Sequence, residues 1–443
     1  MTESLRRTIG PVQATAMVVG TIIGASIFVQ PSAVTRAVPA VGGIFAVWIA
    51  AGLLTLVGSL IAAELASAFP RTGGIYVYLR EAFAPSLGFL WGWAMFWTMH
   101  TGIIAAIAMV FARYLAVLIP LGDVGQRAAA IAAVLALSVV NYTGVKAASL
   151  LQTTFTIAKL LAIVIVIAIA FSLGPRSPVP PPAGAAAVRA SAFLLATAAG
   201  LFAFGGWHMV TFAAGETIEP RRTIPRALAS GVVIVTACYV ALNAAYLHLL
   251  PLRTVIDSSR VAADAADAVL GTGGAVFMSA LVVVSTFGAL SGIVLAGPRA
   301  YLSMAEDGLL FAWLATVHPR FRTPHRAIVL QAVWATVLLA TGSYAVLVAR
   351  VIYTEWIFFA LLAIGVVLLR RRPDYAPAYR IPAAPWLPLA FACVAALVVV
   401  NQIAAQPLES ATGLLLVLVG WPVYRLWTRR RTASLSHALT HGD

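Results

Sequence analysis

Residues 19–28 read VGTIIGASIF, and residues 201–208 read LFAFGGWH. Both stretches place glycines in the middle of an apolar run, where a lipid-facing helix would avoid them. A helix that unwinds at such a point leaves backbone N–H and C=O groups without partners where there is no water. Paired glycine-interrupted spans are typical of transporters built from two inverted repeats, with the substrate site at the breaks. Close packing through small residues would explain either stretch alone.

The composition indicates a membrane protein. Of 443 residues, 61% are hydrophobic and 10% charged, and the mean hydropathy is +0.96. Soluble proteins carry about 25% charged residues, so a soluble enzyme, a secreted disulfide scaffold and a disordered chain are excluded. The two cysteines, Cys238 and Cys393, lie inside apolar runs. We expect them to be buried and reduced, with no disulfide framework or zinc site.

Twelve apolar runs are long enough to cross a bilayer, which takes roughly 20 residues each. The sequence therefore predicts an all-α polytopic membrane protein with twelve transmembrane helices in a single domain. The predicted spans are 11–34, 41–68, 87–119, 127–142, 152–173, 191–214, 226–249, 273–305, 326–341, 346–369, 385–402 and 410–427. The segment 174–190, which contains five prolines, reads as a connector between two halves.

The basic residues predict the orientation. If the N-terminus is cytoplasmic, 19 of the 29 basic residues fall in inner loops and tails, 7 in outer loops and 3 within spans. Such an excess indicates that both termini are cytoplasmic, in the plasma (inner) membrane. The net charge of +14 then reflects topology and does not predict a nucleic-acid partner.

The paired breaks suit a zwitterionic ligand. A carboxylate can take N–H groups at a half-helix N-terminus, and an ammonium can take the freed carbonyls. We therefore expect a small-molecule L-amino acid as substrate, the lipid bilayer as surroundings and no cofactor or metal.

Several motifs carry a family resemblance. They are GTIIGASIF at 20–28, EL at 64–65, FPRTGGIYVY at 69–78, FAFGGW at 202–207, Glu216, Glu219-Pro220, Ser291-Gly292, Arg299, EDG at 306–308 and His318-Pro319. Together they resemble permeases of the amino acid–polyamine–organocation superfamily, in particular the L-type amino acid transporter branch. The match runs from about residue 11 to residue 427.

The resemblance implies the leucine-transporter fold, with inverted five-helix repeats at 11–173 and 191–369 and two further helices at 385–427. It also implies a carboxylate held by amides around Ala25 and Ser26, with Phe202 as an aromatic lid. The ammonium would be held by carbonyls around Ile22, Phe202, Ala203 and Gly205. The candidate substrate-binding residues are Ile22, Gly24, Ala25, Ser26, Ile27, Phe202, Ala203, Phe204, Gly205, His208 and Glu355.

The sequence departs from the branch in three places. The first break reads Gly24-Ala25-Ser26, where glycine is common in third place. The loop after the third span, around residues 120–123, lacks the cysteine through which animal members join a glycoprotein heavy chain, so no disulfide-linked heavy chain is expected. The third departure is Glu355.

Lys159 lies within the fifth span, where a charge is costly and by default marks a pathway or an ion pair. Snorkelling toward the interface is the alternative. In the resembling family a lysine here takes the place of a sodium ion and ties the first span to the eighth, which we expect near Ser291. This favours a sodium-independent exchanger or facilitator. A proton-coupled symporter and a cationic amino acid or polyamine carrier remain the alternatives.

Glu355 in the tenth span must be protonated, paired or turned toward a water-filled cavity. The resemblance places this position at the side-chain end of the pocket, so an acid here should exclude acidic substrates and favour neutral ones. We expect it to pair with Arg113 or His100, or to stay protonated. A purely structural paired carboxylate is the other interpretation.

Four acids near the predicted inner ends of spans, Glu64, Glu216, Glu306 and Asp307, favour a salt-bridge network with loop arginines. His100 and His208 are each more typical of a satisfied hydrogen-bonding residue than of a proton relay, although His208 is expected to face the pocket.

Other function classes fit less well. A membrane-embedded enzyme would need paired aspartates, a metal motif or a nucleophile turn, and the sequence has none of these. The paired breaks argue against a simple pore, whereas a sensor that has lost transport would keep the same site.

Overall fold

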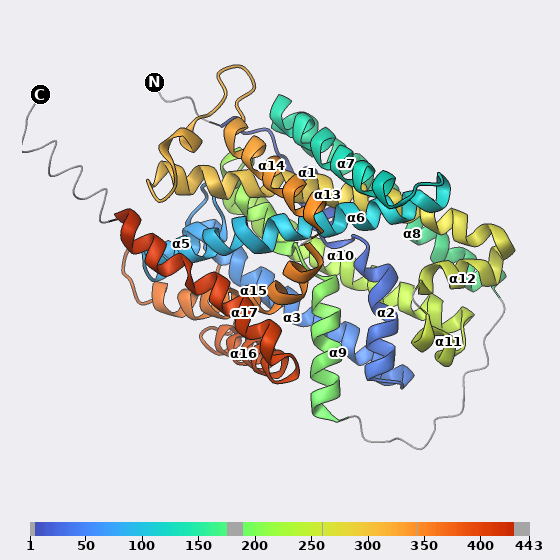
Figure 1. The fold of residues 1–443 in the computed structure, drawn as a ribbon. Coiled ribbons are helices and arrows are strands. Elements are labelled where there is room, and N and C mark those ends of the chain that lie inside the picture. The colour runs from blue at the N-terminus through green and yellow to red at the C-terminus, as the bar shows by residue number, and fades with distance from the viewer. Residues whose placement is uncertain (1–4, 175–188, 259, 343, 429–443) are drawn as a thin grey trace, which may run out of the picture.

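The computed structural model describes residues 5–174, 189–258, 260–342 and 344–428, with the backbone alone at 272 and 344–352 (Figure 1). Most of the proline-rich connector predicted at 174–190 lies outside them. The described chain is helical, and its one extended pairing is an isolated bridge between Ile9 and Thr217. The helices are α1 (Pro11–Ile22), α2 (Ser26–Ala37), α3 (Val41–Ala68), α4 (Ile75–Ala82), α5 (Pro85–Ala94), η1 (Met95–Met99), α6 (His100–Leu118), α7 (Asp123–Thr143), α8 (Val145–Leu173), α9 (Ala190–Ala203), η2 (Trp207–Glu216), α10 (Pro220–Leu249), α11 (Leu252–Asp257), α12 (Val261–Leu270), η3 (Gly271–Gly273), α13 (Gly274–Glu306), η4 (Ala312–Ala315), α14 (His325–Thr341), α15 (Tyr344–Leu369), α16 (Trp386–Ala405) and α17 (Pro407–Leu418).

The all-α polytopic fold is confirmed. Among the described residues, nine helices are long and apolar enough to cross a membrane. The pair α1 and α2, bent by 47°, makes a tenth if it counts as one span, and α14 and the described part of α15 are shorter apolar helices. Each of the twelve predicted runs falls on one of these segments, but the number of crossings stays a prediction.

Helix α13 is the centre of the bundle. Every residue from Gly288 to Ala305 is buried, and the helix packs against α1, α6 and α8. Helices α16 and α17 lie at the edge of the bundle (Figure 1) and expose much of their surface. Cys393 on α16 is accordingly exposed. Cys238 is half-buried on the face of α10 that also exposes Ile234, so the prediction that both thiols are buried is wrong.

Gly20 and Gly206, which lie in the two glycine-containing stretches, have different structural roles. A Cβ at Gly20 would lie 2.2 Å from the Gln152 and Thr156 side chains of α8, so Gly20 permits close packing of α1 on α8. Gly206 has φ of +96°, in the left-handed region that favours glycine. Small-residue packing therefore explains Gly20, whereas Gly206 belongs to an unwound turn.

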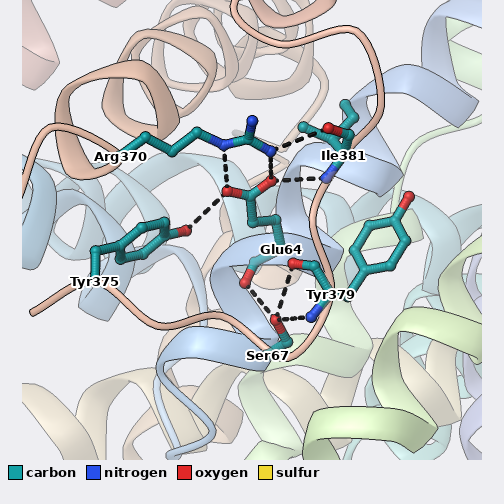
Figure 2. Close-up of polar contacts among 6 residues, drawn as sticks. All are labelled: Glu64, Ser67, Arg370, Tyr375, Tyr379 and Ile381. Atoms are coloured by element: carbon teal, nitrogen blue, oxygen red, sulfur yellow. Dashed lines mark hydrogen bonds and ion pairs between the residues drawn. The ribbon is translucent and has the colours of Figure 1, made fainter. Parts of the chain in front are cut away.

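Glu64 on α3 organises the segment that follows α15. Its carboxylate accepts hydrogen bonds from Arg370 at 2.5 and 2.8 Å, from the Ile381 amide at 2.7 Å and from the Tyr375 hydroxyl at 3.3 Å (Figure 2). The bond to Glu64 raises the pKa of Arg370, and burial raises the pKa of Tyr375. The Ser67 hydroxyl, one turn along α3, accepts from the Tyr379 amide. Together these bonds fasten the 370–381 segment to α3.

Three of the four acids form salt bridges. Two pair with arginines of the predicted loops, as expected, whereas Glu216 pairs with an arginine within a predicted span. Glu216 forms a bidentate pair with Arg299, in which both side chains are fully buried. Glu64 pairs with Arg370, and Asp307 with Arg80. Glu306 is exposed and forms no ion pair within the described part of the chain.

Both ends of the described chain lie at one end of the bundle (Figure 1). Ile9 bonds to Ile218 just beyond η2, and the Trp427 indole donates to the Gly308 carbonyl just beyond α13. Arg299 and Glu216 join the same ends of α13 and η2. We call this the terminal end; which side of the membrane it faces stays a prediction.

Candidate functional site

A cavity of about 80 Å³ lies between the two broken helices. Residues of α1, α2, α6, α9, η2, α13 and α15 line it. They are Thr21, Ile22, Gly24, Ser26, Ile103, Ala106, Ile107, Leu201, Phe202, Gly205, Gly206, Trp207, Met209, Ile293, Glu355, Trp356 and Phe359. The lining is largely apolar, so backbone atoms at the breaks and the Glu355 carboxyl supply most of its polar chemistry.

The start of α2 presents unpaired amides beside the cavity. In the part of the chain that is described, the N–H groups of Ala25, Ser26 and Ile27 make no backbone hydrogen bond, and no side chain caps the helix. The Gly24 amide closes a tight turn onto the Ile22 carbonyl at 2.8 Å. Unpaired amides at a helix N-terminus carry a partial positive charge and suit a carboxylate.

The carbonyls at the ends of α1 and α9 are held by one side chain. The Tyr239 hydroxyl of α10 lies 3.1 Å from the Ile22 carbonyl oxygen and 2.9 Å from that of Ala203. A hydroxyl has one proton and can donate fully to only one of them at a time. These two carbonyls are among those expected to hold an ammonium group, so a bound cation would share them with Tyr239 or displace its bond.

Lys159 is fully buried and does not snorkel. Its Nζ donates to the carbonyl oxygens of Gly20 at 2.9 Å, Ile23 at 2.7 Å and Ser285 at 3.1 Å. These are the three bonds that an ammonium group can donate. Lys159 therefore ties the first break to α13, as the sequence predicts. The tie falls at Ser285 and not near Ser291, whose buried hydroxyl has no partner among the described residues.

The predicted binding residues divide into two groups. Ile22, Gly24, Ser26, Phe202, Gly205 and Glu355 line the cavity, whereas Ala25, Ile27, Ala203, Phe204 and His208 do not. Ala25 directly precedes α2 in the first break, and Ala203 is the last residue of α9. The buried ring of Phe204 packs against Tyr239, with centroids 5.0 Å apart.

The expectation that His208 faces the pocket is wrong. Its ring is buried among Trp91, Trp207, Phe212 and Phe359. The segment after the break is a 3₁₀ helix, in which residues three apart share a face. Met209 of this segment lines the cavity, whereas His208 does not and packs against Trp207 and Phe359, which do line it.

Glu355 lines the cavity and is half-buried. Neither of its two expected partners contacts it, because Arg113 is exposed on α6 and the His100 ring nitrogen bonds to the Ile293 carbonyl at 2.8 Å. No hydrogen bond or ion pair joins Glu355 to another described side chain. It is the only ionisable group among the cavity's lining residues that are described.

Sequence reasoning missed the apolar end of the cavity and Tyr239. Ile103, Ile107, Trp356 and Phe359 come from α6 and α15 and have no motif that distinguishes them from other lipid-facing or packed residues. Helical spacing would have found Phe359, because it lies four residues after Glu355 and so on the same helix face.

Comparison with known proteins places the chain in a family. The family model described as amino acid permease matches residues 9–423. The chain is 33% identical to the serine/threonine exchanger SteT of Bacillus subtilis, over 97% of this chain and 99% of that protein. It is 31% identical to the large neutral amino acids transporter small subunit 2 of Homo sapiens, over 96% of this chain and 81% of the relative. It is 29% identical to the b(0,+)-type amino acid transporter 1 of Homo sapiens, over 92% of this chain and 84% of that protein. The chain therefore belongs to the amino acid permease family, whose members are multi-pass membrane transporters and not enzymes.

Proposed function

We propose that this permease is a sodium-independent exchanger of neutral L-amino acids that works by alternating access. The observation that carries the proposal is the cavity between the breaks, where unpaired amides of α2 and the carbonyl ends of α1 and α9 meet. The α-carboxylate would bind the amides of Ala25, Ser26 and Ile27. The α-ammonium would bind carbonyls around Ile22 and Ala203. Backbone recognition of this kind accepts any amino acid whose side chain fits.

Lys159 supports independence from sodium. Three carbonyl oxygens converge on its Nζ, and oxygens in such an arrangement would otherwise coordinate a hard cation. Because a covalently attached cation already fills this position, a sodium ion has no role in holding α1 against α13.

The apolar lining of the cavity supports neutral side chains. Its walls include Ile107, Trp356 and Phe359, and the Glu355 carboxyl is the one ionisable group described there. A carboxylate on the substrate side chain would meet Glu355 and lose its hydration without gaining a cation. Small and medium neutral side chains meet no such cost.

Exchange is supported by the relatives, since SteT is named as an exchanger. Alternating access in this fold would move repeats 11–173 and 191–369 against each other, with 385–427 as two additional helices. The terminal end would face the cytoplasm of a cell whose inner membrane holds the protein. The loop between α6 and α7 has no cysteine, so we expect activity without a disulfide-linked heavy chain.

Proton-coupled symport is the second candidate. The Glu355 carboxyl beside the cavity, which has no partner among the described residues, favours it. An inward proton gradient across proteoliposomes distinguishes the two. It should leave uptake by an exchanger unchanged, whereas uptake by a symporter rises with the gradient.

Competition binding to the purified permease tests the substrate assignment. Radiolabelled serine and leucine serve as ligands, and alanine, aspartate, arginine, leucinamide and leucine methyl ester as competitors. Neutral amino acids should compete, while the amide and the ester should fail because they lack the negative charge that the α2 amides stabilise. Equal competition by the blocked analogues would rule out this carboxylate site.

A further inference from the structure

A second cavity, of about 480 Å³, lies at the terminal end beside the junction of α7 and α8. Five basic side chains line it, and none of its described lining residues is acidic. The basic residues are Arg6, Arg7, Lys146, Arg320 and Arg322. This cavity is separate from the one between the breaks, with which it shares no lining residue.

Three segments far apart in the sequence bring the cations together. The N-terminal segment carrying Arg6 and Arg7 is fastened by the bridge between Ile9 and Thr217. Lys146 lies in the first turn of α8. The loop before α14, which carries Arg320, is shaped by the His318 ring, whose Nδ1 accepts hydrogen bonds from the amides of residues 320 and 321 at 3.1 Å. These contacts fix the positions of the segments that carry the basic residues.

The N-terminus of α8 adds to the positive potential. The helix has 29 residues and begins at Val145 in the cavity wall. Gly144, which joins α7 to α8, has φ of +150°, in the left-handed region that favours glycine. The first amides of a helix have no partner inside it and attract anions. A phosphate oxygen in the cavity would therefore meet both side-chain cations and backbone amides.

The cavity lies where a bilayer presents its headgroups. Helices α7 and α8 are both long and apolar enough to cross a membrane, and a single residue joins them. Their junction must therefore stand at the end of two spans, at the membrane surface. The wall also contains the apolar residues Val145, Ile218 and Phe321.

We propose that this cavity binds the phosphate group of an anionic phospholipid. The segment that carries Arg6 and Arg7 leads through Ile9 into α1. Ile9 also bridges to Thr217, which follows η2, so the segment contacts both broken helices. Lys146 and Arg320 belong to neighbouring segments. A bound phosphate would therefore join the broken helices to α8 and to the loop before α14. It would also screen the repulsion among the like charges of Arg6, Arg7, Lys146 and Arg320.

Lipid retention by the full-length permease tests the proposal. Protein purified in detergent is supplied with phosphatidylglycerol, phosphatidylcholine or inorganic phosphate, and binding is followed by native mass spectrometry and by the melting temperature. Wild type should retain about one phosphatidylglycerol, and inorganic phosphate at equal concentration should not displace it. Phosphatidylcholine should bind at least tenfold more weakly, since it lacks the net charge.

Two variants with a matched control locate the site. Arg6→Gln/Arg7→Gln and Lys146→Gln should each weaken phosphatidylglycerol binding at least tenfold, because charge-assisted hydrogen bonds to the phosphate are lost. Arg221→Gln/Arg222→Gln removes two exposed charges of α10 that do not line the cavity and should change binding less than threefold. An equal loss in the control means general surface charge and overturns the proposal, as does equal stabilisation by inorganic phosphate. Size-exclusion profiles and amino acid binding check that each variant is folded.

Discussion

Replacing Lys159 by methionine tests the proposed substitute for sodium most sharply. Methionine keeps most of the volume of the buried stem but removes all three bonds from Nζ to the carbonyls of Gly20, Ile23 and Ser285. Each hydrogen bond to a charged group is worth about 1.5–3 kcal/mol, and the three are not additive. The change also leaves buried carbonyls without partners. We therefore expect the break conformation that Lys159 holds to be destabilised by about 3–5 kcal/mol.

The assay is counterflow of radiolabelled serine into proteoliposomes loaded with unlabelled serine. A loss of that size corresponds to about 100-fold or more in rate. Lys159→Ala, which leaves space beside the same carbonyls, should recover part of its activity in sodium buffer, because the three oxygens and the Ser285 hydroxyl can coordinate a small cation. Arg113→Met removes an exposed charge from another span and should keep near wild-type rates. If Lys159→Met exchanges within threefold of wild type, the reasoning is refuted.

Three further predictions concern the cavity and its support. Glu355→Gln should leave serine binding within threefold of wild type but improve competition by aspartate about tenfold, since like-charge repulsion is removed; an unchanged competition profile would exclude a selectivity role. Tyr239→Phe should lower the melting temperature of the empty permease, because the Ala203 carbonyl loses its hydroxyl donor and the Ile22 carbonyl keeps only the Gly24 amide, at a cost of about 1–3 kcal/mol. The shift on adding substrate should then exceed that of wild type, and a smaller shift would contradict competition between the hydroxyl and the ammonium. Glu216→Gln should destabilise the protein by about 3–5 kcal/mol, because it leaves the Arg299 guanidinium buried without a counter-charge. The double variant Glu216→Gln/Arg299→Met should recover part of this in thermal melting, and a single-variant loss below about 1 kcal/mol would argue against a buried ion pair.

The positions of the breaks could be predicted because backbone chemistry in lipid is restrictive. A glycine in the middle of an apolar run must either permit close packing or mark an unwound turn, and both occur here, at Gly20 and at Gly206. The bonding of Lys159 could also be predicted, because a cation inside the membrane requires partners. The acids at span ends pointed to ion pairs for the same reason, and Glu64, Glu216 and Asp307 have them.

The remaining details depend on local geometry that periodicity does not encode. His208 does not line the cavity, and its segment winds as a 3₁₀ helix, whose rotation per residue differs from that of an α-helix. Lys159 reaches Ser285 and not Ser291 because side-chain packing sets how far α8 is shifted along its axis relative to α13. Tyr239 lies within a long regular helix, and nothing in its sequence context reveals that its hydroxyl meets two breaks.

The central claim is exchange without sodium at the site between the two breaks. The most direct test measures uptake of radiolabelled serine and leucine into proteoliposomes of the purified permease, either empty or loaded with unlabelled amino acid, in sodium or in choline buffer. The account predicts uptake that depends on internal amino acid and is equal in the two buffers. Uptake into empty vesicles that rises with external sodium would contradict it.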